Sequence, residues 1–127
     1  MIKINTDKRI INLEKQTQRT VLITGSTRGI GKETALLLLK KELNVIISSR
    51  SQQSVDNVIQ EILDKFPSKK EGLKSDVSKQ YDVKSPVGVS IKRFGKIDIL
   101  VNNAGIVYFK CLLDTTEEEW DKLLILI

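Results

Sequence analysis

The residues best suited to chemistry in this chain lie in one short segment, Thr24-Gly25-Ser26-Thr27-Arg28-Gly29-Ile30-Gly31. Its three glycines allow a tight turn and let the backbone approach a ligand closely. An apolar run precedes the segment and a helical pattern follows it, so unpaired amides at the start of that helix can face an anion. A glycine-rich turn alone is a weak signal, but between a strand and a helix it predicts a site for the diphosphate of a dinucleotide.

A second polar group, Ser48-Ser49-Arg50, follows the next apolar run, about 20 residues beyond the glycines. An acidic residue at this position normally binds the ribose 2′-hydroxyl of NAD. Arg50 can instead bind the 2′-phosphate of NADP through two hydrogen bonds, and Arg28 can reach the same group. A single arginine would be an ordinary surface charge. Two arginines and a missing acid together favour NADP as the cofactor over NAD.

Composition excludes several other kinds of site. The chain has no histidine, so the commonest general base and metal ligand is absent, and we predict no metal site. The only cysteine, Cys111, permits no intrachain disulfide, which fits a reducing cytoplasm, and its apolar neighbours favour packing over catalysis. The basic residues that give the net charge of +5 are scattered, so we expect no nucleic-acid partner. Residues 1–20 contain no run suited to a signal peptide or membrane span, and we expect a cytoplasmic protein without membrane contact.

The chain alternates short apolar runs with longer amphipathic ones, as repeated βαβ units around a parallel sheet do. Residues 21–23 and 45–47 predict buried strands, and residues 30–42 predict the helix between them. Ser51 is the predicted N-cap of a second helix, whose single apolar stripe stops at Pro67.

The next unit contains one awkward stretch. Residues 69–75 are mostly polar, so a strand there should lie at the edge of the sheet, whereas residues 97–101 predict a well-defined strand. A helix between them would place Pro86 and Gly88 in its interior, at a cost of about 3 and about 1 kcal/mol. We therefore expect that helix to begin or restart at Ser85, with Pro86 at its first position.

A last helix is predicted from the spacing of Thr116 and Glu119, which is that of a capping box. Its apolar face consists of Trp120, Leu123, Leu124 and Ile127.

Four motifs in order resemble the short-chain dehydrogenase/reductase family. The spacing Gly-x-x-x-Gly-x-Gly after Thr24 is the first, and Asp76-Val77 after the third strand is the second. Asn102-Asn103-Ala104-Gly105 follows the fourth strand, and Trp120 lies near the start of the last helix. Each motif alone is an ordinary turn or helix start, but their order at βαβ intervals over about residues 20–127 favours the resemblance.

The resemblance implies the fold class and the site residues. The expected fold is α/β, a Rossmann-like doubly wound parallel sheet that is incomplete, with about four strands and flanking helices. Asp76 would accept a hydrogen bond from the adenine amino group, and Asn103 to Gly105 would lie along the cofactor, while Asn102 and Thr24 brace the central strands. The predicted cofactor-binding residues are Gly25, Ser26, Thr27, Arg28, Gly29, Ile30, Gly31, Ser49, Arg50, Asp76, Val77, Asn103, Ala104 and Gly105.

The resemblance also implies hydride exchange between NADP(H) and a small-molecule carbonyl or alcohol substrate. The family's catalytic Tyr-x-x-x-Lys pair has no match here, since Tyr81 and Tyr108 are followed four positions later by Ser85 and Leu112. We therefore predict no catalytic residue and describe residues 20–127 as a partial dinucleotide-binding domain, truncated before the catalytic half, after a polar lead-in at 1–19. The fourth strand and last helix should then expose apolar faces, and the complete protein should be a homo-oligomer. The alternative is a non-catalytic NADP(H)-binding module or an inactive fragment.

Overall fold

The computed structural model describes residues 18–67 and 70–125. Four parallel strands form one sheet in the order β3-β2-β1-β4. Their bounds are Thr20–Ile23 for β1, Asn44–Ser49 for β2, Lys70–Lys74 for β3 and Ile99–Val101 for β4. This arrangement confirms the predicted doubly wound sheet, with the polar strand β3 at an edge. Of the predicted lead-in, residues 1–17 lie outside the described residues.

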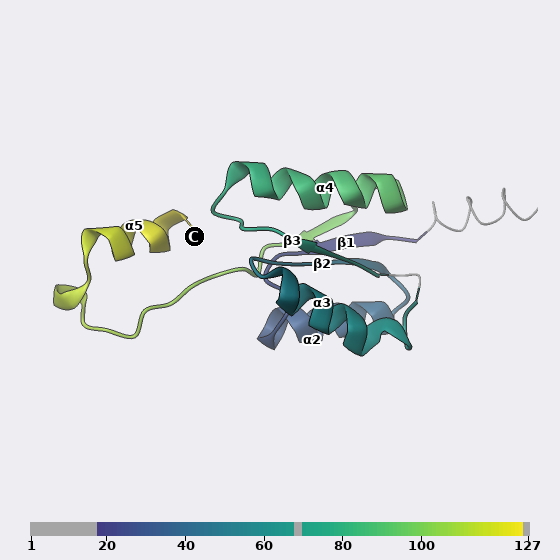
Figure 1. Cartoon of the computed structure of the whole chain (residues 1–127), viewed down its shortest axis with the longest axis horizontal. Helices are drawn as coiled ribbons and strands as arrows, with labels where there is room; N and C mark the ends of the chain where they lie inside the picture. The colour runs from purple at the N-terminus through teal and green to yellow at the C-terminus, as the bar shows by residue number, and fades with distance from the viewer. Residues whose placement is uncertain (1–17, 68–69, 126–127) are drawn as a thin grey trace, which may run out of the picture.

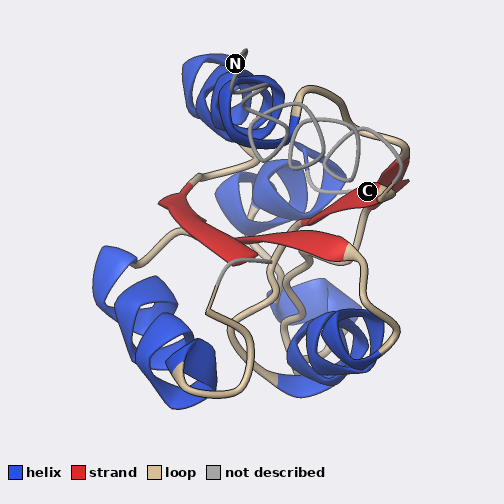
Figure 2. Cartoon of the chain, turned by 90° about the vertical axis from the view of Figure 1, so that its right-hand side faces the viewer, coloured by secondary structure: helices blue, strands red, loops and turns tan. Residues whose placement is uncertain are grey.

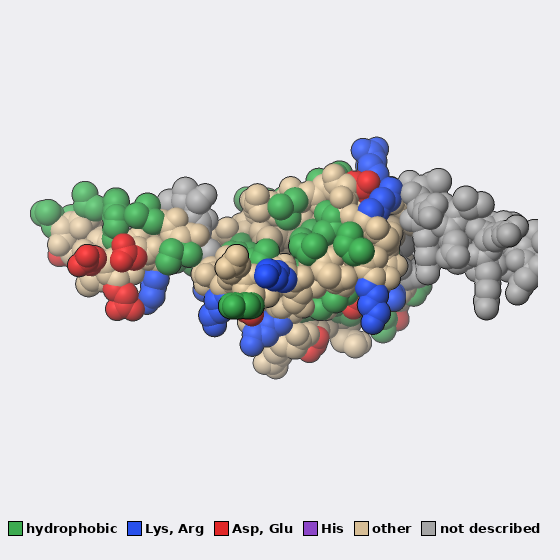
Figure 3. Space-filling model, turned by 90° about the horizontal axis from the view of Figure 1, so that it is seen from above, with side chains coloured by type: hydrophobic (Ala, Val, Ile, Leu, Met, Phe, Trp, Pro, Cys, Tyr) green, Lys and Arg blue, Asp and Glu red, His purple; other side chains and the backbone are tan. Residues whose placement is uncertain are grey.

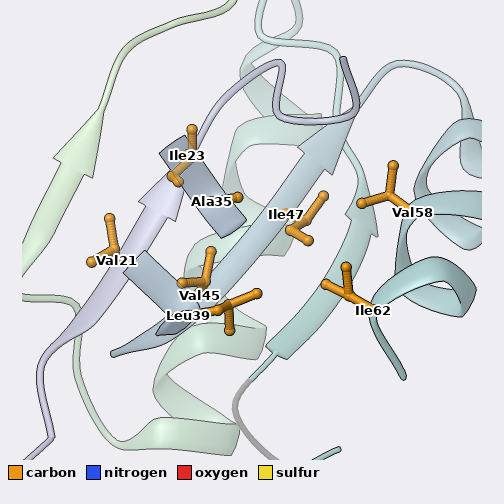
Figure 4. Close-up of a cluster of buried hydrophobic side chains, with 8 residues drawn as sticks. All are labelled: Val21, Ile23, Ala35, Leu39, Val45, Ile47, Val58 and Ile62. Carbon is orange, nitrogen blue, oxygen red and sulfur yellow. The ribbon is translucent and has the colours of Figure 1, made fainter. Parts of the chain in front are cut away.

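Helices cover both faces of this sheet (Figures 1 and 2). Helices α2 (Gly29–Lys40) and α3 (Gln52–Leu63) cover one face, and α4 (Gln80–Phe94) covers the other. Side chains alternate along each strand, so each helical layer receives its own set of apolar residues. The larger core consists of Val21, Ile23, Ala35, Leu39, Val45, Ile47, Val58 and Ile62 (Figure 4). The smaller core joins Leu22 and Ile46 to Phe94 of α4.

The strand order creates a switch point between β1 and β4. From β1 the chain crosses through α2 to β2 on one side, whereas from β3 it crosses through α4 to β4 on the other side of β1. The connection that leaves β1 and the one that leads into β4 therefore lie on opposite sides of β1, and a crevice opens at the carboxyl ends of β1 and β4. Binding residues are therefore expected at that edge of the sheet.

Two predicted helix caps are confirmed. The hydroxyl of Ser51 accepts a hydrogen bond from the Ser54 N–H at 3.2 Å, where α3 begins. At the start of α5 (Glu117–Ile125), the Glu119 N–H donates to the Thr116 hydroxyl, and the Thr116 N–H donates to the Glu119 carboxylate. This reciprocal pair is the predicted capping box. Ile127, placed by prediction on the apolar face of this helix, lies outside the described residues.

The prediction of a break or start at Ser85 is wrong, because α4 runs without interruption across Pro86. A proline in a helix interior leaves the carbonyl four residues earlier without its usual N–H donor. Here that carbonyl belongs to Asp82, and the Ser75 hydroxyl donates to it at 3.0 Å. The proline ring is also buried against the protein. A side-chain hydrogen bond and burial together offset the cost that propensity alone assigns to this proline.

Residues 102–125 form a C-terminal arm that extends from the sheet and ends in α5 (Figure 1). The arm contains a short 3-10 helix, Leu112–Asp114, and carries many exposed apolar side chains together with acidic ones (Figure 3). Trp120 is 48% exposed, and Leu100 of β4 is 56% exposed. The predicted uncovered apolar faces of the fourth strand and last helix are therefore confirmed. Packing of Cys111 is wrongly predicted, because this residue is exposed on the arm.

None of the helices in the described part of the chain combines the length and the apolar character needed to cross a membrane.

Candidate functional site

A hollow of about 340 Å³ lies where the strands end. Its walls come from the turn after β1 and from the segments that follow the other strands. The lining residues are Gly25, Thr27, Arg28, Gly29, Ser49, Arg50, Ser75, Val77, Asn103, Ala104, Gly105 and Ile106. Segments far apart in sequence thus converge at the crevice that the strand order creates.

The turn after β1 depends on glycine at two positions. Gly25 and Gly29 have φ angles of +63° and +55°, a conformation that residues with a β-carbon rarely adopt. A β-carbon on Gly25 would also lie 2.9 Å from the Ala104 Cα. Between the two glycines, the Ser26 hydroxyl donates to the Ile23 carbonyl at 2.8 Å and accepts from the Ser48 N–H at 2.9 Å. These bonds hold the turn against the ends of β1 and β2.

The start of α2 faces the hollow without a side-chain cap. Arg28 is the N-cap residue, its side chain makes no capping hydrogen bond, and the first turn contains no acidic residue. The first N–H groups of a helix have no intrahelical partner, and the helix dipole adds partial positive charge there. Arg28 and Gly29 both line the hollow. The arrangement suits an anion with several acceptor oxygens, such as a phosphate.

Asn103 joins the segment after β4 to the glycine turn. Its side-chain amide donates to the carbonyl oxygens of Thr24 and Gly25, both at 3.0 Å. The Thr24 hydroxyl accepts from the N–H groups of Asn103 and Ala104 at 3.0 Å and donates to the Val101 carbonyl at 3.3 Å. The predicted bracing role of Thr24 is confirmed.

The bracing role predicted for Asn102 is wrong, because its side chain is exposed and Asn103 makes those hydrogen bonds. Both asparagines follow a strand, and successive residues of extended backbone point to opposite sides. Sequence alone does not tell which of the two faces the turn.

A second hollow, of about 830 Å³, shares Arg28, Arg50, Gly105 and Ile106 with the first, so the two form one groove. Its other walls are Asp76, Ser78, Val107, Tyr108, Lys122 and Ile125. Both arginines are exposed, and Asp76 is the only acidic residue among the described lining residues. The groove is therefore mainly cationic, with one carboxylate at its β3 end.

Hydrogen bonds from Ser78 lower the pKa of Asp76, and the positive charges of Lys79 and Arg50 lower it further, against a smaller opposing effect of burial. The Ser78 hydroxyl and N–H donate to Oδ1 of Asp76 at 2.7 and 3.1 Å. Asp76 is thus ionised near neutral pH and can only accept hydrogen bonds.

Most of the predicted site residues meet at this groove. Gly25, Thr27, Arg28, Gly29, Ser49, Arg50, Val77, Asn103, Ala104 and Gly105 line the first hollow, and Asp76 lines the second. The remaining three do not line either hollow: Ser26 is buried under the turn, the Ile30 side chain is 81% exposed, and Gly31 is buried behind Asn103.

Two lining residues of the first hollow escaped prediction, and so did Ser78, Val107, Tyr108, Lys122 and Ile125 of the second. In the first hollow, Ser75 directly follows the polar strand β3 and Ile106 follows Gly105. Ser75 and Ile106 each lie directly beside a predicted motif, so extending each motif by one residue would have found these two. The described residues contain no group of three or more histidine, cysteine, aspartate or glutamate side chains that could hold a metal ion.

Comparison with known proteins gives a consistent result. A family model described as short chain dehydrogenase matches residues 19–126. The chain is 35% identical over 113 residues to "Dehydrogenase/reductase SDR family member 4" of Caenorhabditis elegans, covering 88% of this chain and 44% of that protein. It is 34% identical over 106 residues to a 3-oxoacyl-(acyl-carrier-protein) reductase of Thermotoga maritima, covering 84% of this chain and 43% of that protein.

Solved structures agree. A 3-ketoacyl-(acyl-carrier-protein) reductase from Brucella melitensis, complexed with NADH, superposes with a TM-score of 0.78 at 33% identity, over 85% of this chain and 43% of that one. An alcohol dehydrogenase from Thermococcus sibiricus, complexed with 5-hydroxy-NADP, superposes with a TM-score of 0.79 at 29% identity, over 86% of this chain and 46% of that one. The chain therefore spans less than half the length of these relatives.

Proposed function

Because this chain belongs to the short-chain dehydrogenase family, we propose that it is the NADP(H)-binding portion of an oxidoreductase that transfers a hydride between NADP and a carbonyl or alcohol substrate. Residues 20–127 then make up a partial dinucleotide-binding domain. The chemistry of the substrate follows the names of its relatives, which include reductases and an alcohol dehydrogenase.

The observation that carries the proposal is the order of functional groups along the groove. Across the sheet, the strand ends present a carboxylate after β3, an arginine after β2, unpaired helix amides after β1 and the Asn103 segment after β4. A dinucleotide presents adenine, a phosphate-bearing ribose, a diphosphate and nicotinamide in a matching order. Each part of the cofactor therefore meets a group of suitable chemistry.

Each residue of this set has a specific role in the proposal. Asp76 accepts a hydrogen bond from the adenine amino group, and Val77 contacts the adenine ring. The amides from Thr27 to Ile30 bind the diphosphate. Asn103, Ala104 and Gly105 lie along the nicotinamide half, while Ser26 and Gly31 shape the turn from behind.

We assign the preference for NADP to Arg28 and Arg50. Both arginines line both hollows, and Ser48 and Ser49 offer no carboxylate to repel a 2′-phosphate. A guanidinium binds a phosphate through two parallel hydrogen bonds and always carries its charge. Relatives of known structure include one bound to NADH and one bound to 5-hydroxy-NADP, so the choice of cofactor in this chain depends on these local side chains.

The bound cofactor supplies the hydride, and this chain's residues bind and orient it. We assign no catalytic residue within the chain. The whole protein is proposed to be a cytoplasmic homo-oligomer acting on a small-molecule substrate, with neither nucleic acid nor membrane as a partner.

The test is titration calorimetry of the chain with NADPH and NADH, before and after Arg50→Asp. The wild type should bind NADPH more tightly, by roughly tenfold or more, since a charge-assisted phosphate contact contributes about 1.5–3 kcal/mol. Arg50→Asp should reverse the order. Lys65→Asp is the matched control, because Lys65 is exposed after α3, at the other end of the sheet, and changes the charge equally. Equal affinities for both cofactors in wild type and variant would refute the NADP assignment.

A further inference from the structure

The turn between β3 and α4 is closed at its base by hydrogen bonds to one residue, Asp82. The hydroxyl of Ser75, itself only 5% exposed, donates to the Asp82 carbonyl at 3.0 Å. The N–H of the next residue, Asp76, donates to the Asp82 carboxylate at a longer 3.4 Å. The two residues that directly follow β3, Ser75 and Asp76, are thus tied to the first turn of α4.

Pro86 keeps the Asp82 carbonyl available for this purpose. In a regular helix, the N–H of residue 86 would donate to the carbonyl of residue 82. Pro86 has no N–H, and it lies in the interior of α4. The Ser75 hydroxyl is therefore the donor that occupies the carbonyl, without competition from the helix backbone.

The tied turn presents the Asp76 carboxylate to the groove. Ser78 occupies Oδ1 through two hydrogen bonds, whereas Oδ2 makes no hydrogen bond to any described residue. Asp76 and Ser78 both line the second hollow. One oxygen is thus fixed by the turn, and the other is left as an acceptor for a ligand.

We propose that Ser75 is a positioning residue for cofactor selection. Its hydrogen bond to the carbonyl that Pro86 leaves open holds Asp76 where Oδ2 accepts from the adenine 6-amino group. This inference rests on the proposed function, because it needs an adenine dinucleotide in the groove. The inference adds to that function a set of three residues, Ser75, Asp82 and Pro86, that positions Asp76 for adenine recognition; we call this set the clamp. Of the three, only Ser75 lines the first hollow.

A cofactor without the amino group tests this directly. Reduced nicotinamide hypoxanthine dinucleotide phosphate carries a carbonyl in place of the adenine 6-amino group and a hydrogen on the neighbouring ring nitrogen N1, and it otherwise matches NADPH. Position 6 then offers Asp76 an acceptor in place of a donor. The wild type should prefer NADPH over the reduced hypoxanthine analogue by roughly tenfold or more, the value of a hydrogen bond to a charged group. Ser75→Ala should weaken NADPH binding by about three- to tenfold and leave binding of the analogue unchanged, since a loosened Asp76 affects only the ligand that donates to it.

Ser90→Ala is the matched control. Ser90 is buried in α4, the helix that contains Asp82 and Pro86, and its hydroxyl donates to the Pro86 carbonyl at 2.6 Å. Like Ser75→Ala, this variant removes a buried hydroxyl that donates to a carbonyl of α4. It should lower the thermal midpoint as Ser75→Ala does, without changing the ratio of the two cofactor affinities. Ser75→Thr, which keeps the hydroxyl, should preserve the wild-type ratio.

Pro86→Ala separates the clamp from general stability. Restoring the N–H at residue 86 gives the Asp82 carbonyl a second donor, so Ser75→Ala should change the cofactor ratio less in this background. If Ser75→Ala leaves the ratio of the affinities for NADPH and the analogue unchanged, whether or not both affinities fall, the positioning role is overturned. A wild type that binds NADPH and the analogue equally would overturn it while leaving the proposed function intact. Failure of the folded wild type to bind either would overturn both.

Discussion

Gly31 offers a sharp test of how the glycine turn and the segment after β4 are locked together. It is the third residue of α2, and a β-carbon built there would lie 2.4 Å from the side-chain nitrogen of Asn103 and 2.6 Å from the Gly25 carbonyl oxygen. Atoms cannot remain this close, and the Gly25 carbonyl belongs to the backbone, which cannot move aside as a flexible side chain can. Gly31→Ala must therefore displace the Asn103 amide and strain the turn.

The expected cost follows from those contacts. Asn103 would lose hydrogen bonds to the Thr24 and Gly25 carbonyls, worth roughly 0.5–1.5 kcal/mol each. Overpacking against the turn adds about 1–3 kcal/mol. The better helix propensity of alanine opposes this by about 1 kcal/mol. The free energy of unfolding should fall by about 1–5 kcal/mol, and NADPH affinity should fall with it because the turn binds the diphosphate in our proposal.

Urea denaturation followed by far-UV circular dichroism measures this change. The single tryptophan, Trp120, is a poor reporter because it lies half-exposed on the arm. Gly88→Ala is the matched control, since a β-carbon at Gly88 meets no atom within 4 Å and the residue lies inside α4. That variant should gain roughly 0.5–1 kcal/mol. If Gly31→Ala proves as stable as Gly88→Ala, the lock between the turn and Asn103 does not exist as described.

Two further predictions concern single side chains. Hydrogen bonds from Lys110 and then from the Thr116 backbone lower the pKa of Glu119 from 4.5 to about 2. Because its pKa is lower in the folded state, Glu119 stabilises the start of α5 above pH 4.5 and loses this effect as the pH falls toward 2. The NMR signals of α5 should therefore lose their helical chemical shifts over that pH range in the wild type. They should not do so in Glu119→Gln. Thr24→Val removes the hydroxyl that two N–H groups share, so the free energy of unfolding should fall by about 1–3 kcal/mol in urea denaturation, and an unchanged midpoint would contradict the bracing role.

Features that depend on neighbouring residues were predictable from sequence. The Ser51 cap and the reciprocal pair of Thr116 and Glu119 each join residues three apart, so spacing alone specifies the contact. The buried strands were predictable because both faces of a parallel strand are covered, which gives continuous apolar runs. The predicted helix at 30–42 matches α2, Gly29–Lys40, to within two residues at either end.

Features that depend on contacts between different elements were not predictable in the same way. The cost of Pro86 was judged within its own helix, whereas the donor that satisfies Asp82 comes from Ser75 at the end of β3. The choice between Asn102 and Asn103 depends on which side chain faces Thr24, which is 79 residues from Asn103. In both cases the deciding hydrogen bond joins a helix or turn to a segment outside it, within one βα unit for Ser75 and Asp82 and between two units for Asn103 and Thr24, so the pattern of a single element does not predict it.

The groove itself divides into two parts that differ in how firmly the fold holds them. Gly25, Arg28, Arg50 and Asp76 belong to segments anchored by the sheet and its helices, whereas Lys122 and the other C-terminal lining residues belong to the exposed arm. Loops with few buried contacts open at low free energy, so groups on the arm contribute less to a fixed binding geometry. In our proposal, the adenine, ribose-phosphate and diphosphate parts of a dinucleotide meet only the anchored segments. The nicotinamide half meets Asn103 to Gly105, where hydrogen bonds from Asn103 to Thr24 and Gly25 tie the start of the arm to the glycine turn. We therefore expect the βαβ body to carry recognition of these three parts of the cofactor, and the arm from Val107 onward to affect chiefly what binds beside it.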